Sequence, residues 1–245
     1  MNMGMDGSWW ASRTSTPVPG ANTVRGGFDS HTFPPSSSPR DEESEAAGRR
    51  APRPAAFLDR DGTLIELVDY PRDPEQVRLC SGAQEGLARL RSAGFALVVV
   101  TNQSGIARGL VTEAERAAVD SRMIELLGPD SAPDLILFCP HLPELTGPCS
   151  CRKPKIGMIR EAERRLALDL DRSYLVGDSP ADIESGRRAG LRTVQVATGY
   201  GSRDLDPALF DFYPPDPDAR SAGLAEACAW ILEDAAVRWT PSDRS

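Results

Sequence analysis

The chain has 245 residues, 40% hydrophobic and 26% charged, which is enough for one domain with a packed core plus tails. Its formal net charge of -8 at pH 7 excludes a broad electrostatic attraction to nucleic acid. No apolar run approaches the roughly 18 residues of a membrane-spanning helix, and no apolar secretory segment follows Met1. We therefore expect a cytoplasmic protein that binds neither membranes nor nucleic acid. We separately expect a monomer.

The two ends of the chain differ in composition from its middle. Residues 1–54 contain neither Leu nor Ile, are rich in Pro, Ser and Gly, and balance six acidic side chains against six arginines. Such a segment cannot bury enough apolar surface to offset the entropy lost on ordering, so we predict a disordered tail over 1–54. We expect a folded domain over 55–239 and a frayed end over 240–245.

Short apolar runs of strand length recur from Ala55 onward. They are Ala55–Leu58, Phe95–Val100, Leu135–Phe138, Tyr174–Val176 and Thr193–Val196. Helical patterns separate most of these runs. Strands that alternate with helices are typical of a parallel sheet with helices on both faces, so we predict an α/β, Rossmann-like fold.

Several helices carry start or stop signals. Thr112 with Glu115 forms a capping box that opens a helix reaching about Leu127. Ser179 suits an N-cap, and Gly190 ends the helix that follows it. Three further helices are indicated by apolar spacing: Ala83, Leu87, Leu90 and Ala93 before Gly94; Ile159, Ala162 and Leu166; and Leu224, Ala227, Cys228 and Ile231.

Polar side chains follow three of the predicted strands. Asp59 and Asp61 come after the first strand. Thr101 follows the second, and Asp178 follows the fourth. Taken singly, these residues could form an acidic turn, an ordinary loop or a helix cap. In such sheets, however, chemistry gathers beyond the carboxyl ends of the strands. Three carboxylates at one edge would repel each other unless a cation joined them, and Mg²⁺ prefers oxygen ligands.

These motifs resemble those of the haloacid dehalogenase-like (HAD) phosphotransferase superfamily over about residues 55–200. The matching residues are Asp59-x-Asp61, Thr101, Lys153 and Gly177-Asp178-x3-Asp182. The resemblance implies a HAD-like fold and makes Asp59 the nucleophile that forms an aspartyl-phosphate. It makes Asp61 the general acid for the leaving oxygen and then the base for the hydrolytic water.

The same resemblance implies a magnesium cofactor. Mg²⁺ would be held by Asp59, by the backbone carbonyl of Asp61 and by Asp178, with Asp182 behind these ligands. Thr101 and Lys153 would hold the oxygens of the transferring phosphoryl group, which needs mainly positioning and charge neutralisation.

A second metal site is indicated just before Lys153. Cys139, His141, Cys149 and Cys151 offer three thiolates and one imidazole, a set that suits tetrahedral zinc. Four protein ligands leave no open position, so the zinc would be structural. The alternative is four unrelated residues, which requires three of the five cysteines and one of the two histidines to cluster by accident. Arg152 and Lys153 follow directly, so the zinc loop would direct both cations toward substrate anions.

One branch of the superfamily matches these features together. The zinc loop, Asp59–Thr63 and Thr101–Gly109 look like those of the D-glycero-D-manno-heptose 1,7-bisphosphate 7-phosphatases and histidinol-phosphate phosphatases. These are small enzymes without a large cap domain, and the chain has room for only a flap and one helix between Asp61 and Thr101. The resemblance implies substrate contacts from Thr101, Asn102, Gln103, Ser104, Arg152, Lys153 and the flap residues 67–70.

Three functions remain open at this point. We favour magnesium-dependent removal of the C7 phosphate from heptose 1,7-bisphosphate, because Thr101–Gly109 and Arg152–Met158 look closest to that group. The loop between His141 and Cys149 has seven residues, closer to the histidinol-phosphate type, and Ser179 stands where heptose enzymes often carry Lys. Histidinol-phosphate phosphatase activity is therefore one alternative. A zinc-stabilised binding module that has lost catalysis is another.

Overall fold

The computed structural model of the chain describes residues 51–203, 211–212 and 215–239. The tail predicted over 1–54 and the end predicted over 240–245 lie outside the described residues, except for 51–54. Within that short stretch, Arg53 already belongs to the fold, because its N–H donates to the carbonyl of Ala167 and its carbonyl accepts from the N–H of Asp169. Pro54 is buried.

Six parallel strands form one sheet in the order β3-β2-β1-β4-β5-β6. The strands are β1 Ala55–Leu58, β2 Ala96–Asn102, β3 Leu135–Cys139, β4 Tyr174–Gly177, β5 Arg192–Val196 and β6 Ala219–Ser221. All five predicted strands are present. The sixth was not predicted, because the three residues of β6, Ala-Arg-Ser, contain no apolar run. The β2–β3 register pairs Asn102 with Cys139, so the carboxyl end of β2 lies beside the start of the Cys/His loop.

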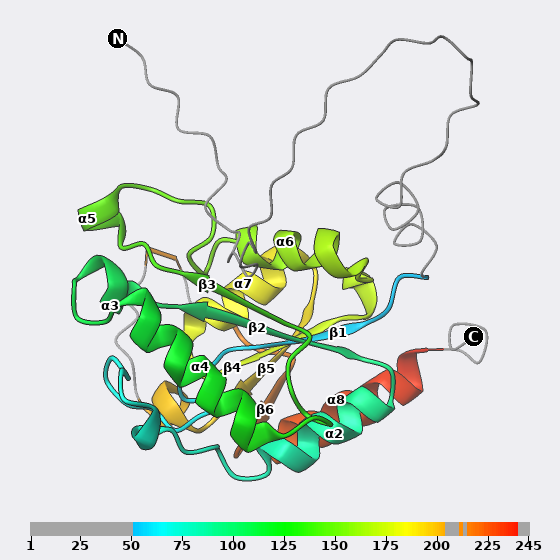
Figure 1. Cartoon of the computed structure of the whole chain (residues 1–245). Helices are drawn as coiled ribbons and strands as arrows, with labels where there is room; N and C mark the ends of the chain where they lie inside the picture. Colours follow the sequence, from blue (N-terminus) through cyan, green and yellow to red (C-terminus); the bar gives the residue numbers. More distant parts are fainter. Residues whose placement is uncertain (1–50, 204–210, 213–214, 240–245) are drawn as a thin grey trace, which may run out of the picture. The chain divides into compact units, whose positions relative to one another are not determined.

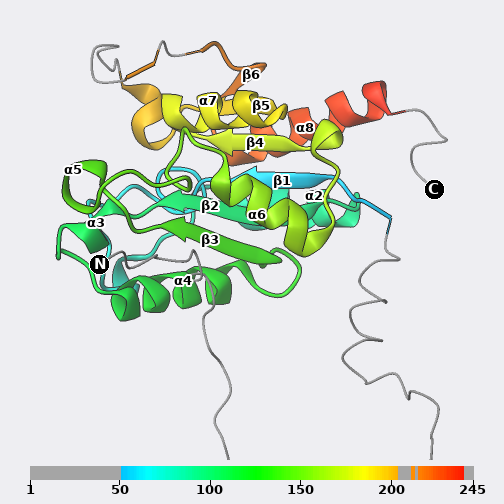
Figure 2. The same ribbon diagram turned by 90° about the horizontal axis from the view of Figure 1, so that it is seen from above.

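Helices cover both faces of the sheet (Figures 1 and 2). The longer ones are α2 Ala83–Ser92, α4 Glu113–Leu127, α6 Gly157–Leu166, α7 Pro180–Ala189 and α8 Leu224–Arg238. The short ones are η1 Pro74–Gln76, α3 Ser104–Ala107, α5 Pro143–Thr146, η2 Leu170–Arg172 and η3 Gly199–Ser202. Figure 1 shows α2, α4 and α8 on one face and α6 and α7 on the other. The predicted α/β, Rossmann-like architecture is therefore confirmed.

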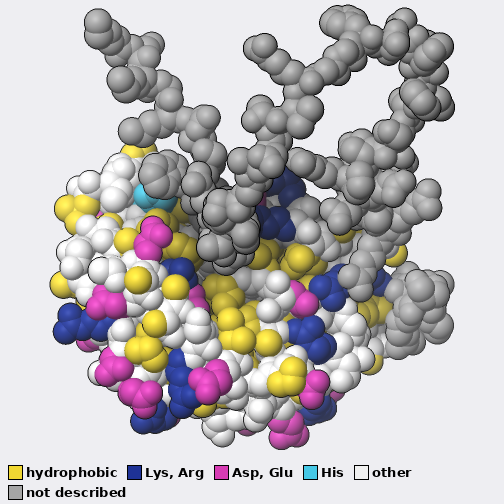
Figure 3. Space-filling view, in the orientation of Figure 1, with side chains coloured by type: hydrophobic (Ala, Val, Ile, Leu, Met, Phe, Trp, Pro, Cys, Tyr) yellow, Lys and Arg dark blue, Asp and Glu magenta, His cyan; other side chains and the backbone are white. Residues whose placement is uncertain are grey.

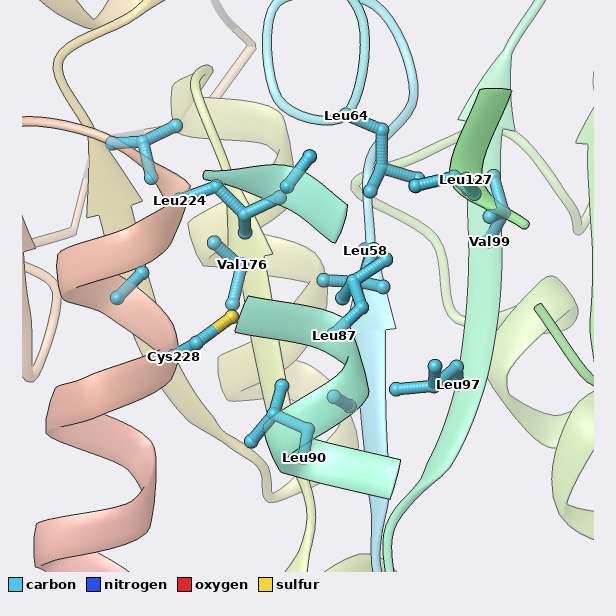
Figure 4. Close-up of a cluster of buried hydrophobic side chains, with 14 of the residues drawn as sticks. Leu58, Leu64, Leu87, Leu90, Leu97, Val99, Leu127, Val176, Leu224 and Cys228 are labelled. Atoms are coloured by element: carbon cyan, nitrogen blue, oxygen red, sulfur yellow. The ribbon is translucent and has the colours of Figure 1, made fainter. Parts of the chain in front are cut away.

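The main core lies between the sheet and helices α2, α4 and α8, which cover one of its faces. In Figure 4, sheet side chains such as Leu58 and Val176 point toward Leu87 of α2 and Cys228 of α8, and all four are at most 1% exposed. Burial of each such aliphatic side chain contributes roughly 1.5–3 kcal/mol. A Cβ on Gly86 would lie 2.9 Å from Sγ of Cys228, so glycine permits the close approach of α2 and α8.

Helix caps fix the loops beside the strand ends. The capping box of Thr112 and Glu115 is present at the start of α4. A second box opens α7, where Asp182 accepts hydrogen bonds from the N–H and hydroxyl of Ser179, and Gly190 ends that helix with φ +82°. Since Asp178 precedes this cap directly, the turn from β4 into α7 sets the positions of both acidic residues.

The face of the molecule seen in Figure 3 carries charges of both signs. In the described part of the face seen in Figure 3, Lys and Arg side chains are interspersed with Asp and Glu. Within residues 51–203 and 215–239, no helix has both the length and the apolar character needed to span a membrane.

Candidate active site

Three carboxylates meet at the carboxyl edge of the central strands. Asp59 follows β1 and Asp178 follows β4, and these strands are parallel neighbours with Leu58 in register with Val176. Asp182 lies in the first turn of α7. One oxygen of each carboxylate lies within 4.8 Å of the others, and all three residues are buried. The sheet therefore brings Asp59 and Asp178 together, as the sequence predicted, and adds Asp182 to the same group.

A single ammonium group lies against two of these carboxylates. Nζ of Lys153 is 2.6 Å from Oδ1 of Asp59 and 2.5 Å from Oδ1 of Asp182, and it donates to the carbonyl of Val100 at 2.7 Å. Lys153 is only 5% exposed. Its charge offsets one of three negative charges, so the group still carries excess negative charge if all three carboxyls are ionised.

Burial and crowding change the acidity of this group. Burial raises the pKa of Asp59 to about 7, against the attraction of Lys153. Burial, together with repulsion from Asp59 and Asp182, raises the pKa of Asp178 to about 8. Burial alone would lower the pKa of Lys153, but the attraction of Asp182 and Asp59 outweighs it and raises that pKa. A second cation beside these carboxylates would relieve the repulsion.

The donor set fits a magnesium ion. Mg²⁺ is bound in proteins mainly through carboxylate, carbonyl and water oxygens, and the carboxylates converge here on one small volume. Two glycines leave room beside Asp178: a Cβ on Gly62 or on Gly199 would lie 2.3 Å or 2.1 Å from its Oδ2. The N–H of Tyr200 donates to the same oxygen at 2.7 Å. The backbone around Asp178 thus holds its carboxylate without side-chain crowding.

The hydrogen-bond partners of Asp61 differ from those of the cluster formed by Asp59, Asp178 and Asp182. Its carboxylate accepts hydrogen bonds from the guanidinium of Arg60 at 2.9 to 3.1 Å and from Nε2 of Gln103 at 2.7 Å. Nε2 of Gln103 also donates to Oγ1 of Thr101 at 2.9 Å. The side chains of Asp61, Thr101 and Gln103 therefore form one hydrogen-bonded set. Sequence reasoning missed Arg60, although it stands between the two motif aspartates.

Asn102 is the last residue of β2, and Ser104 follows two positions later. The side-chain amide of Asn102 makes two hydrogen bonds to the backbone of Lys153. Ser104 is the first residue of α3 and is half-buried. The next residue, Gly105, faces the ring of Tyr70 in the flap, since an added Cβ would lie 2.7 Å from Cδ1 of Tyr70. A hollow of about 330 Å³ lies beside the flap, lined by Val68, Asp69, Tyr70, Arg72, Gln76 and Leu110.

The four predicted zinc ligands form a second cluster. The distances from Cys139 Sγ are 3.6 Å to His141 Nδ1, 3.7 Å to Cys149 Sγ and 3.1 Å to Cys151 Sγ, and His141 Nδ1 lies 3.3 Å from Cys151 Sγ. A tetrahedron with zinc–sulfur bonds of about 2.3 Å has edges of about 3.7 Å. The cysteines are free thiols, so the cluster has the donors and the size to hold a metal ion.

Contacts around this cluster fix the segment that follows it. Hydrogen bonding with Cys139 lowers the pKa of Cys151 to about 5, so one thiol of the pair ionises readily. Nη1 of Arg152 donates to the carbonyl of His141 at 3.3 Å. Nζ of Lys155 donates to the carbonyl of Cys149 at 2.6 Å. The side chain of Lys153 therefore extends away from the cluster to Asp59 and Asp182, whereas those of Arg152 and Lys155 donate to carbonyls of the Cys/His loop.

Comparison with known proteins places this geometry in a family. Residues 150–227 match the family model described as HAD-hydrolase-like. A D-glycero-D-manno-heptose-1,7-bisphosphate 7-phosphatase of Thermosynechococcus vestitus is 37% identical over 197 residues, covering 76% of this chain and 100% of the relative. The chain belongs to the haloacid dehalogenase-like phosphatase family. It is thus an enzyme of the phosphoric monoester hydrolase class, as the motifs predicted.

Two further relatives are also named as phosphatases. A D-glycero-beta-D-manno-heptose-1,7-bisphosphate 7-phosphatase of Mesorhizobium japonicum is 46% identical over 144 residues, which are 56% of this chain and 66%, just under two thirds, of the relative. A crystal structure of D,D-heptose 1,7-bisphosphate phosphatase from B. bronchiseptica, complexed with magnesium and phosphate, superposes with a TM-score of 0.65 at 33% identity. That superposition covers 74% of this chain and 99% of the other.

Proposed function

We propose that this phosphatase removes the C7 phosphate of D-glycero-D-manno-heptose 1,7-bisphosphate in a magnesium-dependent reaction. The observation that carries the proposal is the position of Asp59. Its carboxylate lies at the end of a central strand, beside Asp178 and Asp182, with the ammonium group of Lys153 at 2.6 Å. A nucleophile and a divalent-cation site therefore share one buried edge of the sheet, as phosphoryl transfer requires. The similarity to named heptose bisphosphate phosphatases supports the choice of sugar.

The reaction proceeds in two displacements at phosphorus. A carboxylate oxygen of Asp59 attacks phosphorus, the bond from phosphorus to the C7 oxygen breaks, and an aspartyl-phosphate forms on Asp59. Asp61 gives its proton to the departing C7 oxygen. Asp61 then takes a proton from a water molecule, which attacks the aspartyl-phosphate and releases inorganic phosphate. Asp59 is regenerated at the end of the cycle.

Other residues of the chain bind and orient the phosphoryl group. Thr101 and Lys153 offer a hydroxyl and an ammonium group to its oxygens. Asn102, Gln103 and Ser104 lie at the same strand end, and Arg152 directly precedes Lys153 in the chain. In this proposal all four contribute to substrate binding, Gln103 in part through its hydrogen bond to Thr101 and Asn102 through its hydrogen bonds to Lys153. Magnesium, when bound by the carboxylates of Asp59 and Asp178 and the backbone carbonyl of Asp61, supplies neutralisation of the phosphoryl charge.

The Cys/His cluster has a structural role in this proposal. Cys139, His141, Cys149 and Cys151 would supply all four ligands of a zinc ion, so the ion would take no part in the chemistry. It would stabilise the loop from which Lys153 extends toward Asp59. The short path from Cys151 to Lys153 makes the ammonium position dependent on the loop.

A substrate panel tests the proposal. Purified protein with magnesium is given both anomers of heptose 1,7-bisphosphate and histidinol phosphate, and ³¹P NMR identifies the phosphate that is lost. We expect the highest kcat/KM for a heptose bisphosphate, loss of the C7 phosphate, and no turnover by Asp59→Asn. A higher kcat/KM for histidinol phosphate would show that histidinol phosphate, and not the heptose bisphosphate, is the preferred substrate. Turnover by Asp59→Asn would exclude Asp59 as the nucleophile.

A further inference from the structure

Arg60 is a fully buried arginine between the two motif aspartates. Its side chain is 0% exposed, yet its guanidinium contacts three polar side chains. Nη1 donates to Oδ1 of Asp120 at 2.8 Å, and Nη2 donates to Oε1 of Gln103 at 2.9 Å. Nε and Nη2 both donate to the carboxylate of Asp61. An arginine in this setting has a fixed planar geometry, so it fixes the orientation of the groups that it binds.

Asp120, which is 60 residues from Arg60 in the chain, accepts a hydrogen bond from the Arg60 guanidinium. It lies on α4, among the buried residues Val119, Met123 and Leu127, and it is 5% exposed. A carboxylate in such a place is costly unless it is paired. Its Oδ2 accepts from Nη1 of Arg116, the guanidinium of which lies 3.8 Å from the centre of the Phe138 ring. Both oxygens of Asp120 are thus occupied by arginines.

Asp61 is the most solvent-exposed of the three charged residues Asp61, Arg60 and Asp120. Side-chain exposure is 17% for Asp61, 8% for Asp120 and 0% for Arg60. A simple apolar packing of α4 against the strand end would need none of these charges. The charges connect α4 to one carboxylate at the catalytic edge, and through Gln103 to Thr101. The network therefore has the layout of a support that orients Asp61.

We propose that Asp120 is a positioning residue that, through Arg60, holds the carboxyl group of Asp61 in place for proton transfer to and from the reacting oxygens. This inference rests on the proposed role of Asp61. The Arg60 guanidinium binds the carboxylate formed when Asp61 has given its proton to the C7 oxygen. It leaves the same carboxylate oriented when the proton returns from water. Asp120 contacts neither substrate nor metal in this scheme, so its removal affects chemistry only through Arg60 and Asp61.

Leaving-group dependence separates this role from simple structural support. A sugar oxygen needs a proton as it departs, whereas p-nitrophenolate leaves without one. Because kcat/KM covers the steps up to departure of the leaving group, we expect Asp120→Asn to lower kcat/KM for heptose 1,7-bisphosphate about 10- to 100-fold. For p-nitrophenyl phosphate we expect a loss of less than about threefold. Asp61→Asn, run in parallel, should show the same contrast with a larger loss for the sugar.

Two further variants protect this test. Arg116→Met removes one partner of Asp120 but keeps Arg60, so it should show a smaller contrast of the same sign if Asp120→Asn fails to fold. Asp134→Asn is the matched control, because Asp134 also pairs with two arginines and accepts from the N–H of Leu97, near the opposite end of β2. It should change kcat/KM for both substrates by the same factor.

The outcomes distinguish the inference from the proposed function. Equal losses for both substrates in Asp120→Asn and Arg116→Met, with a clear contrast in Asp61→Asn, overturn the positioning role but leave Asp61 as the acid. The absence of contrast in Asp61→Asn removes both the proton-transfer role of Asp61 and the inference. Turnover of the sugar by Asp59→Asn would instead remove the proposed nucleophile.

Discussion

The side-chain amide of Asn102 is bonded in both directions to the backbone of Lys153. Oδ1 of Asn102 accepts from the N–H of Lys153 at 3.0 Å, and Nδ2 donates to the carbonyl of Lys153 at 3.1 Å. These residues are 51 positions apart in the chain. The contact joins the end of β2 to the segment after the Cys/His cluster, and it fixes the backbone from which the Lys153 ammonium reaches Asp59.

Loss of this pair of hydrogen bonds should weaken catalysis through Lys153. We expect Asn102→Ala to lower kcat about tenfold or more, because a displacement of about 1 Å in a positioning group can cost about 100-fold. Steady-state kinetics on the heptose substrate measures the effect. Gln84→Ala is a suitable control, since Gln84 also uses its amide to bond a backbone carbonyl, that of Leu127, between α2 and the end of α4. A similar loss of kcat in both variants would contradict the role of Asn102.

The Cys/His cluster should affect activity although it supplies no catalytic ligand. We expect Cys151→Ser to lower the zinc content of the purified protein and to lower kcat even at saturating magnesium, because the loop no longer fixes Lys153. Elemental analysis and kinetics on the same preparations give both quantities. Cys80→Ser is the control, because it changes a buried free thiol outside the cluster. The Cys80→Ser protein should contain as much zinc as wild type. Wild-type protein that contains no zinc after purification without chelator would exclude a zinc site.

Asp178 should destabilise the metal-free protein as the pH rises. Its folded-state pKa of about 8 lies above the usual value of 3.8, so it binds a proton more readily when folded. This contribution to stability is complete below about pH 4 and is lost as the pH rises through about 8. In chelator at pH 8, Asp178→Asn should therefore raise the free energy of unfolding by roughly 1–3 kcal/mol, and the gain should disappear near pH 4.

Thermal unfolding with and without magnesium completes this measurement. Wild-type protein should gain Tm on addition of magnesium, because the ion binds only the folded carboxylate group. Asp178→Asn should show little of this gain and should have no phosphatase activity. An Asp178→Asn variant that is less stable than wild type at pH 8 in chelator would contradict the assigned repulsion.

Gly199 should be required for magnesium binding, because only glycine leaves space for the Asp178 carboxylate beside it. Its φ of +57° favours glycine, and a Cβ there would lie 2.1 Å from Oδ2 of Asp178 and 2.7 Å from Cα of Gly62. Gly199→Ala should therefore displace the Asp178 carboxylate and weaken magnesium binding, as well as cost about 1 kcal/mol in backbone strain. Titration of activity with magnesium measures the first effect.

Gly109 provides the matched control for that substitution. Its φ is +69°, but a Cβ would meet nothing within 4 Å. Gly109→Ala should therefore carry only the backbone cost of about 1 kcal/mol, with an unchanged magnesium requirement. Equal magnesium dependence in the two variants would show that the contact with Asp178 is unimportant.

Local spacing determined most of the elements and most of the candidate site. The strand after Pro54, the capping box at Thr112 and the start of α7 at Pro180 were all predictable, because each depends on residues within a few positions of one another. The order of polar residues after apolar runs also indicated which carboxylates would meet. In a parallel sheet, strand direction alone brings these ends to one edge.

Only the tertiary structure decided the contacts between distant polar side chains. Arg60 with Asp120 and Asn102 with Lys153 are 60 and 51 residues apart, and no local pattern specifies such pairs. They depend on the order of strands in the sheet and on how α4 and the Cys/His loop pack beside it. A sequence shows that an acidic residue lies on an apolar helix face, but only packing shows which cation balances its charge.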